Sequence, residues 1–163
     1  MRVSTDCSPP SDASNPVISK NGPESKYPVQ KLSFSTQELL ISMVDFMTAQ
    51  CKRYNDVPQV RWMDVVNETI DKGSMDWFGP RPGTDRWENP WTKIGFDKTH
   101  PLEPPLYIGF AFHIANRFAP NIDLIINQHG SVSPKLWDKI FALVDYLRQH
   151  KGLRVDGIGW QAH

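Results

Sequence analysis

The sequence has little of what marks a disulfide-stapled, membrane-spanning or nucleic-acid-binding protein. Two cysteines in 163 residues, Cys7 and Cys51, are too few for a disulfide framework or a zinc ligand set. The 18 acidic and 18 basic residues cancel and are well mixed, which excludes a basic stripe for nucleic acid. No apolar run reaches the roughly 18 residues that a membrane span needs. The five histidines are scattered without metal-ligand spacing, so we expect no metal and no cofactor.

The first part of the chain differs in composition from the rest. Residues 1–30 are rich in proline and serine and show no hydrophobic periodicity, which predicts a flexible leader or a segment out of its context. These residues also lack the apolar core of a signal peptide. We expect one folded domain over residues 31–163.

Within that domain, helical and strand patterns alternate. Ser35 and Glu38 fit a capping box at the start of a helix that ends before Pro58. The further elements expected are a strand over 60–66, a helix from 104–105 to 120, a strand over 123–128, a helix from 133–134 to 152 and a final strand in 155–163. Such alternation predicts right-handed crossovers and a parallel sheet. A doubly wound sheet and a (β/α)8 barrel both fit this order.

Each expected helix carries one apolar stripe. The stripe of the first helix is Leu40, Met43, Val44, Met47, Cys51 and Tyr54; that of the second is Ile108, Ala111, Phe112 and Ala115; that of the third is Trp137, Ile140, Phe141, Val144 and Leu147.

The connection after the first strand favours the barrel. It covers residues 69–104, about 36 residues, whereas loops beyond about 15 residues in compact domains are usually functional or disordered. Its tryptophans, Trp77, Trp87 and Trp91, are not typical of disorder. Because it follows a strand, it begins at the carboxyl end of the sheet, where α/β active sites are built.

Glu68 is the first candidate for chemistry. It follows a β-branched run at the carboxyl end of an expected buried strand, and partial burial there suits a carboxylate to acid or base catalysis. The alternative is a carboxylate that caps the next helix or is solvated at the rim. Asn67 would orient a substrate hydroxyl or cap the turn.

The aromatic loop and the last strand add two further signals. Trp77, Trp87 and Trp91 would stack on sugar rings or form a small local core that holds the loop shut. In the last strand Gly157, Gly159, Gln161 and His163 share one face, and Asp156, Ile158, Trp160 and Ala162 share the other. The first face is small and then polar, as expected of a barrel wall that meets its site, and the bulkier second face suits contact with helices.

Three stretches in order, RWMDVVNE, PLYIGFAFHIANRFAPNIDLIINQ and VDGIGWQAH, resemble glycoside hydrolase family 10, the β-1,4-xylanases. The resemblance runs from about residue 35 to residue 163 and implies a partial (β/α)8 TIM barrel, roughly strands 4 to 6 with their helices. Met63 is one residue more than the family's first motif has. Asn127, Gln128 and His129 stand where the family commonly has Asn-Asp-Tyr, which leaves the roles of Gln128 and His129 open.

The resemblance implies the following roles. Glu68 would be the general acid/base of a retaining reaction on β-1,4-xylan. Asn67 would bond the 2-hydroxyl of the sugar at the cleavage point, and Asn127, Gln161 and His163 would line the substrate site, His163 beside the nucleophilic carboxylate. No nucleic acid or membrane partner is expected. Family members are generally secreted or periplasmic, so the localisation expected here rests on resemblance alone.

The nucleophilic glutamate of the family belongs to the seventh barrel strand, and this sequence resembles the family only as far as the sixth. Asp64 shares a face with Glu68 but lies about 13 Å away along a strand, whereas retaining pairs are about 5–5.5 Å apart. We therefore expect a fragment without its nucleophile, with little activity alone and with open sheet edges that invite self-association. The alternatives are a non-catalytic carbohydrate-binding remnant that uses the tryptophans, and a free-standing α/β domain of unrelated function.

Overall fold

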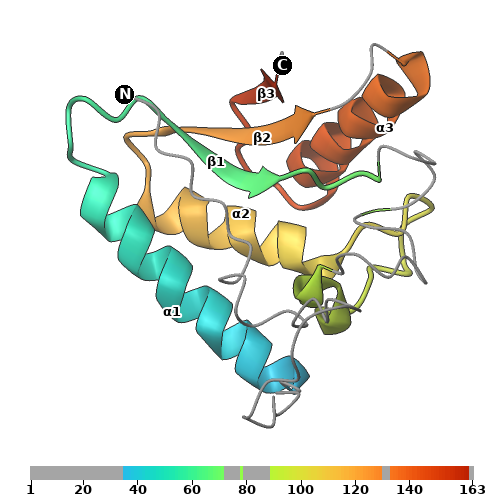
Figure 1. The fold of residues 1–163 in the computed structure, drawn as a ribbon, viewed down its shortest axis with the longest axis horizontal. Helices are drawn as coiled ribbons and strands as arrows, with labels where there is room; N and C mark the ends of the chain where they lie inside the picture. The colour runs from blue at the N-terminus through green and yellow to red at the C-terminus, as the bar shows by residue number, and fades with distance from the viewer. Residues whose placement is uncertain (1–34, 72–77, 79–88, 130–132, 162–163) are drawn as a thin grey trace, which may run out of the picture.

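The computed structural model describes residues 35–71, 78, 89–129 and 133–161. Residues 1–30, the expected leader, lie outside these ranges. Helices and strands alternate along the described chain, as the sequence predicts: α1 (Thr36–Tyr54), β1 (Trp62–Asn67), the 3₁₀ helix η2 (Pro90–Ile94), α2 (Leu106–Phe118), β2 (Asp123–His129), α3 (Pro134–Asp145), the single π-helical turn η3 (Tyr146–His150) and β3 (Gly157–Gln161) (Figure 1).

The three strands form one parallel sheet in the order β1-β2-β3. Neighbouring strands in this sheet are also consecutive in the chain, which is the strand order of a (β/α)8 barrel. The pairing of β1 with β2 shifts between Asp64 and Val66, so that β1 carries one extra residue there. Beyond this bulge Asn67 pairs with Asn127, which in turn pairs with Gly159, and the strands therefore end side by side.

Helix α1 begins with the expected capping box. The Ser35 hydroxyl accepts a bond from the Glu38 N–H (3.2 Å), and the Glu38 carboxylate accepts one from the Ser35 N–H (2.8 Å). The buried row is Leu39, Met43, Met47 and Cys51, at a spacing of four residues. The expected stripe was therefore wrong at one edge: the buried row begins at Leu39, Leu40 is only partly buried, and Val44 is exposed.

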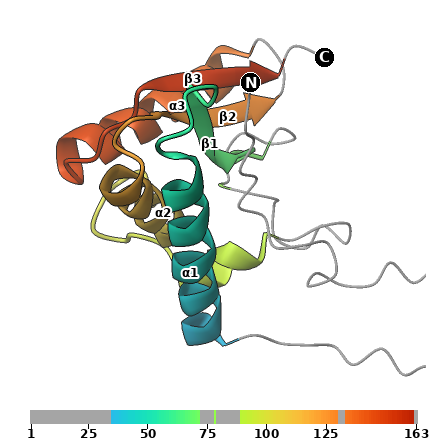
Figure 2. The same cartoon turned by 90° about the vertical axis from the view of Figure 1, so that its left-hand side faces the viewer.

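Helix α2 lies against the sheet and beside α1 (Figures 1 and 2). Its expected apolar face is confirmed, because Ile108, Ala111, Phe112 and Ala115 are fully buried. On the strands, Met63, Leu124 and Ile126 form a second fully buried layer. Burial of apolar area between the two layers contributes about 25 cal/mol per Å² and holds α2 to the sheet.

Two apolar predictions near the end of the chain were wrong. Phe141 was expected in the buried stripe of α3, but it is exposed, with its ring near that of the partly buried Trp137. Leu136 and Leu143 complete the buried face. Trp160 was expected under covering helices, but its side chain is 54% exposed at the edge strand β3. The expected stop at Gly152 is confirmed by its φ of 64°, in the left-handed region that glycine favours.

The connection between β1 and α2 is tied to η3 and to the residue after it through Asp97. This nearly buried carboxylate accepts bonds from the Thr99 N–H (3.0 Å) and hydroxyl, from the Tyr146 hydroxyl (2.7 Å) and from the Lys151 ammonium group (2.8 Å). Lys151, followed by the bonds from Thr99 and Tyr146, holds the pKa of Asp97 well below its usual range. The residues involved are about 50 positions apart, and the long connection is thereby anchored to the rest of the fold.

Candidate active site

Glu68 is held at the carboxyl end of β1 in an uncommon backbone conformation. Its φ is 50°, in the left-handed region that costs an L-residue roughly 1–2 kcal/mol. Its N–H donates to the Asn127 carbonyl at 2.8 Å, so the left-handed residue stays bonded to the neighbouring strand. The side chain is 37% exposed. Strained backbone of this kind tends to cluster at functional sites, and here it turns a carboxylate out at the end of the sheet.

Three amide side chains join at the residue before it. The Asn67 side-chain oxygen accepts a bond from Asn127 Nδ2 at 2.7 Å and another from Gln161 Nε2 at 2.9 Å. One residue from each strand therefore takes part, and the sequence did not predict that they bond to one another. Because both bonds use Oδ1, the Asn67 NH₂ group is the part of this amide left to donate elsewhere.

Glycine on β3 makes room for this arrangement. A Cβ at position 159 would lie 2.7 Å from Asn127 Oδ1, closer than two such atoms can approach. At position 157 a Cβ would meet Ile125 Cγ2 at 3.3 Å. The small-then-polar face expected for this strand is therefore the face over which Asn127 lies.

Gln128, whose role the sequence left open, holds the chain that follows Glu68. Its side chain is buried (1% exposed) and pairs with the backbone of Ile70: Oε1 accepts from the Ile70 N–H at 3.3 Å, and Nε2 donates to the Ile70 carbonyl at 3.2 Å. The same Nε2 donates to the His129 carbonyl at 2.9 Å. One amide thus fixes the segment on both sides of the carboxyl-end turn.

His129, the last residue of β2, lies beside the candidate acid. Its Nε2 is 3.9 Å from Glu68 Oε2, and its side chain is 25% exposed. By register it pairs with Gln161. Sequence reasoning did not predict this pair, and the only signal was the position of His129 two residues after Asn127, on the same face of β2. We refer to Asn67, Glu68, Asn127, His129 and Gln161 as the carboxyl-end cluster.

The remaining predicted site residues are not part of this cluster as the structure describes it. Trp91 is 7% exposed and belongs to the hydrophobic core. Its burial favours the local-core interpretation over sugar stacking, because neither face of the ring is open to a ligand. Trp77, Trp87 and His163 lie outside the described residues. Among the residues that are described, no group of three or more histidine, cysteine, aspartate or glutamate side chains could hold a metal ion.

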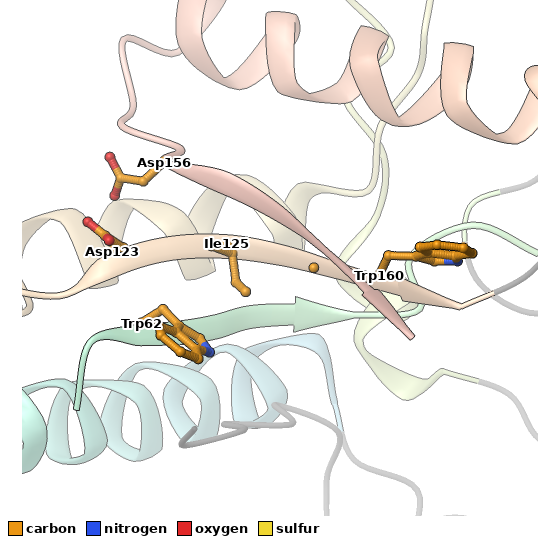
Figure 3. A pocket seen from close by; sticks show the side chains of 6 residues that line it. Trp62, Asp123, Ile125, Asp156 and Trp160 are labelled. Carbon is orange, nitrogen blue, oxygen red and sulfur yellow. The ribbon is translucent and has the colours of Figure 1, made fainter. Parts of the chain in front are cut away.

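A separate hollow lies on the sheet along β3 (Figure 3). Its lining includes Trp62, Asp123 and Asp156, which stand at the amino ends of the three strands, together with Ile125, Gly159 and Trp160. None of the carboxyl-end cluster lines it. Trp62 precedes Glu68 by six residues of nearly extended chain, about 20 Å at the usual strand rise, so this end of the hollow lies far from the candidate acid. The other end reaches Gly159, which pairs with Asn127 of the cluster.

Solved structures with the same arrangement of elements define the class of fold. A xylanase from Paenibacillus barcinonensis, solved in complex with a conduramine derivative, superimposes with a TM-score of 0.63 at 28% identity, over 83% of this chain and 35% of that one. An endo-1,4-β-xylanase from Caldicellulosiruptor owensensis gives 0.61 at 27% identity, over 82% and 35%. The chain therefore folds as part of a (β/α)8 barrel.

The sequence comparisons name the family. The sequence model of Glycosyl hydrolase family 10 matches residues 24–163, and the chain belongs to that family. It is 29% identical over 147 residues to endo-1,4-β-xylanase A of Caldicellulosiruptor saccharolyticus, which covers 90% of this chain and 34% of that protein. It is 38% identical over 100 residues to endo-1,4-β-xylanase A of Thermotoga neapolitana, over 61% and 8%. The chain thus spans about a third or less of these relatives.

No helix among the described residues is long and apolar enough to cross a membrane.

Proposed function

We propose that the chain carries the acid/base half of a retaining β-1,4-xylan hydrolase site. The observation that supports this best is Glu68 at the carboxyl end of β1, beside amides from all three strands. Glu68 would protonate the glycosidic oxygen as the leaving sugar departs and later take a proton from the attacking water. A side chain that is partly exposed and held by a bonded backbone has access both to substrate and to water.

The amides would bind the sugar at the cleavage point. Asn67 would donate from its NH₂ group to a ring hydroxyl, because its oxygen already accepts two bonds. Asn127 and Gln161 hold that amide in place and would themselves line the substrate site, together with His163. A β-1,4-linked xylan chain or oligosaccharide is the ligand that the similarity to xylanases supports.

The nucleophile of the retaining reaction would come from outside residues 1–163. The carboxylates at the amino ends of β2 and β3, Asp123 and Asp156, are at the wrong end of the sheet. Asp64 is buried and four residues before Glu68, about 13 Å of strand, against the roughly 5–5.5 Å of a retaining pair. A strand that pairs with the open edge of β3 would bring the second carboxylate to the cluster, and self-association through such edges would compete with it.

The absence of the nucleophile can be tested on the chain itself. We expect purified chain to release reducing sugar from xylan no faster than its Glu68→Gln variant. A release that Glu68→Gln abolishes would show that a second carboxylate is present after all. Retention on xylan that survives Glu68→Gln but is lost with Trp77→Ala and Trp87→Ala would favour the carbohydrate-binding alternative.

The acid/base role requires a complete barrel. Residues 35–163 can replace the matching span of the C. owensensis xylanase, which supplies the other strands. In that chimera we expect Glu68→Gln to lower kcat on xylan by about 10²–10⁴-fold, the usual contribution of a positioned acid or base. The loss of kcat/KM should be much smaller on an aryl xyloside whose leaving group departs without a proton, because kcat/KM reports only the steps up to the covalent intermediate. The kcat on that substrate should still fall, because Glu68 also deprotonates the attacking water in the second step.

Glu103→Gln is the matched control. Among the described residues, Glu103 is the other non-glycine residue with positive φ, 44°, but it is exposed in the connection before α2. Its substitution should leave both rates unchanged. Equal losses of kcat/KM on xylan and on the aryl xyloside with Glu68→Gln would contradict an acid/base role for this carboxylate.

A further inference from the structure

The backbone on both sides of the candidate acid is bonded to β2. Before the turn, the Glu68 N–H donates to the Asn127 carbonyl at 2.8 Å. After it, Ile70 exchanges two bonds with the Gln128 side chain, at 3.3 and 3.2 Å. Main chain therefore holds one side of the left-handed residue. On the other side, the Gln128 side chain ties Ile70 to β2, and an antiparallel bridge joins Ile70 to Phe78.

The Gln128 amide has the geometry of a backbone unit. It offers one oxygen and one NH₂ group to the N–H and carbonyl of the same residue, as a paired strand would. Burial makes this pairing matter, because an unpaired buried amide group costs roughly 1–3 kcal/mol. The chain after Glu68 is thus given a strand-like partner where β1 itself has ended at Asn67.

The same amide also contacts the residue beside the acid. Gln128 Nε2 donates to the His129 carbonyl at 2.9 Å, and His129 Nε2 lies 3.9 Å from Glu68 Oε2. The segment that carries Glu68 and the strand end that carries His129 are therefore joined through one buried side chain. A movement of the Gln128 amide would shift both the segment that carries Glu68 and the strand end that carries His129.

We propose that Gln128 is a positioning residue for Glu68: by pairing with the Ile70 backbone, it keeps the left-handed turn that aims the carboxylate at the carboxyl-end cluster. Gln128 does not touch substrate and acts only through the turn. The inference rests on the proposed function for its consequence in catalysis, but the geometry of the turn can be measured whether or not the chain acts on xylan.

The structure offers a matched control at the opposite end of the sheet. Asn116 Oδ1 accepts from the Arg154 N–H at 2.7 Å, and its Nδ2 donates to the Arg154 carbonyl at 3.1 Å. This is the same two-bond pairing of an amide side chain with one backbone residue, placed just before β3 and away from Glu68. Loss of either amide should destabilise the fold, but only one of them should disturb the acid.

The experiment compares Gln128→Met and Asn116→Leu by amide hydrogen exchange and by the ¹³C signal of the Glu68 carboxyl carbon. With Gln128→Met we expect exchange at both Ile70 and Glu68 to accelerate about tenfold or more relative to the global rate, as local opening would allow. The Glu68 carboxyl signal should also shift or broaden. With Asn116→Leu both readouts should match the unaltered chain after correction for global stability.

A second variant keeps the test decisive if Gln128→Met does not fold. In Gln128→Glu, an ionised carboxylate accepts from the Ile70 N–H but cannot donate to the carbonyls of Ile70 and His129, whereas the protonated acid can donate to one of them. Lowering the pH should therefore restore protection at Glu68 in this variant, measured as the exchange rate relative to the intrinsic rate at each pH. Slow exchange at Glu68 and an unchanged carboxyl signal in both Gln128 variants would overturn the proposal and leave Gln128 a packing residue.

The catalytic consequence is read in the chimera described above. Gln128→Met should lower kcat on xylan at nearly constant KM. The substitution disturbs the orientation of the Glu68 carboxylate and leaves the sugar contacts of Asn67 in place. If the turn opens but Glu68→Gln has no effect on kcat, the proposed function fails while the positioning stands. If Glu68→Gln abolishes activity and Gln128→Met leaves the turn closed, the positioning fails alone.

Discussion

The side-chain oxygen of Asn127 lies too close to Gly159 for that residue to carry a Cβ. The oxygen and such a Cβ would be 2.7 Å apart, and they belong to paired residues of β2 and β3. Asn127 in turn donates to Asn67, one residue before the candidate acid. Gly159 on β3 therefore leaves room for the Asn127 side chain in the position from which it bonds to Asn67 on β1.

Gly159→Ala should consequently disturb the carboxyl-end cluster. The added methyl forces Asn127 out of its position, and we expect a loss of about 1–3 kcal/mol, as for other overpacked sites. The side-chain NH₂ signals of Asn67 and Asn127 should shift together, because one accepts from the other. Urea unfolding gives the stability, and NMR of the amide side chains gives the geometry.

Two other glycines serve as controls for that substitution. At Gly157 the added methyl meets only Ile125 Cγ2 at 3.3 Å, so a smaller loss is expected. At Gly109, within α2, it meets nothing within 4 Å, and alanine should stabilise the helix by about 0.5–1 kcal/mol. Amide signals of Asn67 that stay in place with Gly159→Ala would contradict the crowding argument.

A second prediction concerns the strain at Glu68. Its φ of 50° is tolerated better by asparagine than by other L-residues and is tolerated worst by β-branched ones. We expect Glu68→Asn to raise the free energy of unfolding by up to about 1 kcal/mol and Glu68→Val to lower it by about as much. Urea midpoints measure both.

The same pair of substitutions at Glu103, where φ is 44°, should change stability in the same directions. Only at Glu68 should the gain in stability accompany a loss of the proposed catalysis, which is the usual cost of a strained functional residue. If Glu68→Val is as stable as Glu68→Asn, then the backbone has relaxed out of the left-handed region and the strain does not exist in solution.

A third prediction concerns Cys51, which is fully buried on the core-facing side of α1. Burial raises the pKa of its thiol to about 11. At pH 8 only about one thiol in a thousand would be ionised, and the thiolate is the reactive form. In a Cys7→Ser variant we expect Cys51 to react with a thiol reagent only as fast as the fold opens. A rate that does not slow when the protein is stabilised would contradict this protection.

How far the sequence predicted this structure depends on the range of the interactions involved. The capping box of Ser35 and Glu38 and the order of the elements were predictable, because each depends on residues close together in the chain. The candidate acid and its amide neighbours were found through motifs at strand ends. Those features depend on neighbouring residues or on side chains that recur on one face of a single helix or strand.

Contacts between distant segments could not be read in the same way. The pairing of Gln128 with Ile70 joins residues 58 positions apart and requires the path of the connection after β1 to be known. The burial of Trp91 and the exposure of Trp160 likewise depend on what covers each ring, which an apolar pattern does not specify. Hydrophobic periodicity predicts a face, and tertiary packing decides which edge of it is covered.

The fourth prediction is that Asp97 makes the stability of the fold sensitive to acid. Its pKa is held below the usual range in the folded chain, mainly by Lys151, so its ionised form favours folding. That stability is present above the ordinary aspartate value of about 3.9 and is lost as the pH falls toward the lowered folded value. Asp97→Asn should therefore be less stable at pH 7 and should lose less stability between about pH 5 and pH 2.

Lys151 and Tyr146, the partners of Asp97, should govern stability on the alkaline side of the same pH profile. The bond to Asp97 raises the pKa of Lys151, and burial, with the bond to Asp97, raises that of Tyr146. The stability they contribute is complete below the ordinary values of about 10.4 and 10 and is lost above them, so Lys151→Met should flatten the alkaline limb of the profile. Urea midpoints from pH 2 to pH 11 measure both limbs, with Asp45→Asn at an exposed position of α1 as the control. An Asp97→Asn variant that declines in acid as steeply as the unaltered chain would show that other carboxylates govern acid unfolding. The anchor between the long connection and η3 would then not depend on this charge.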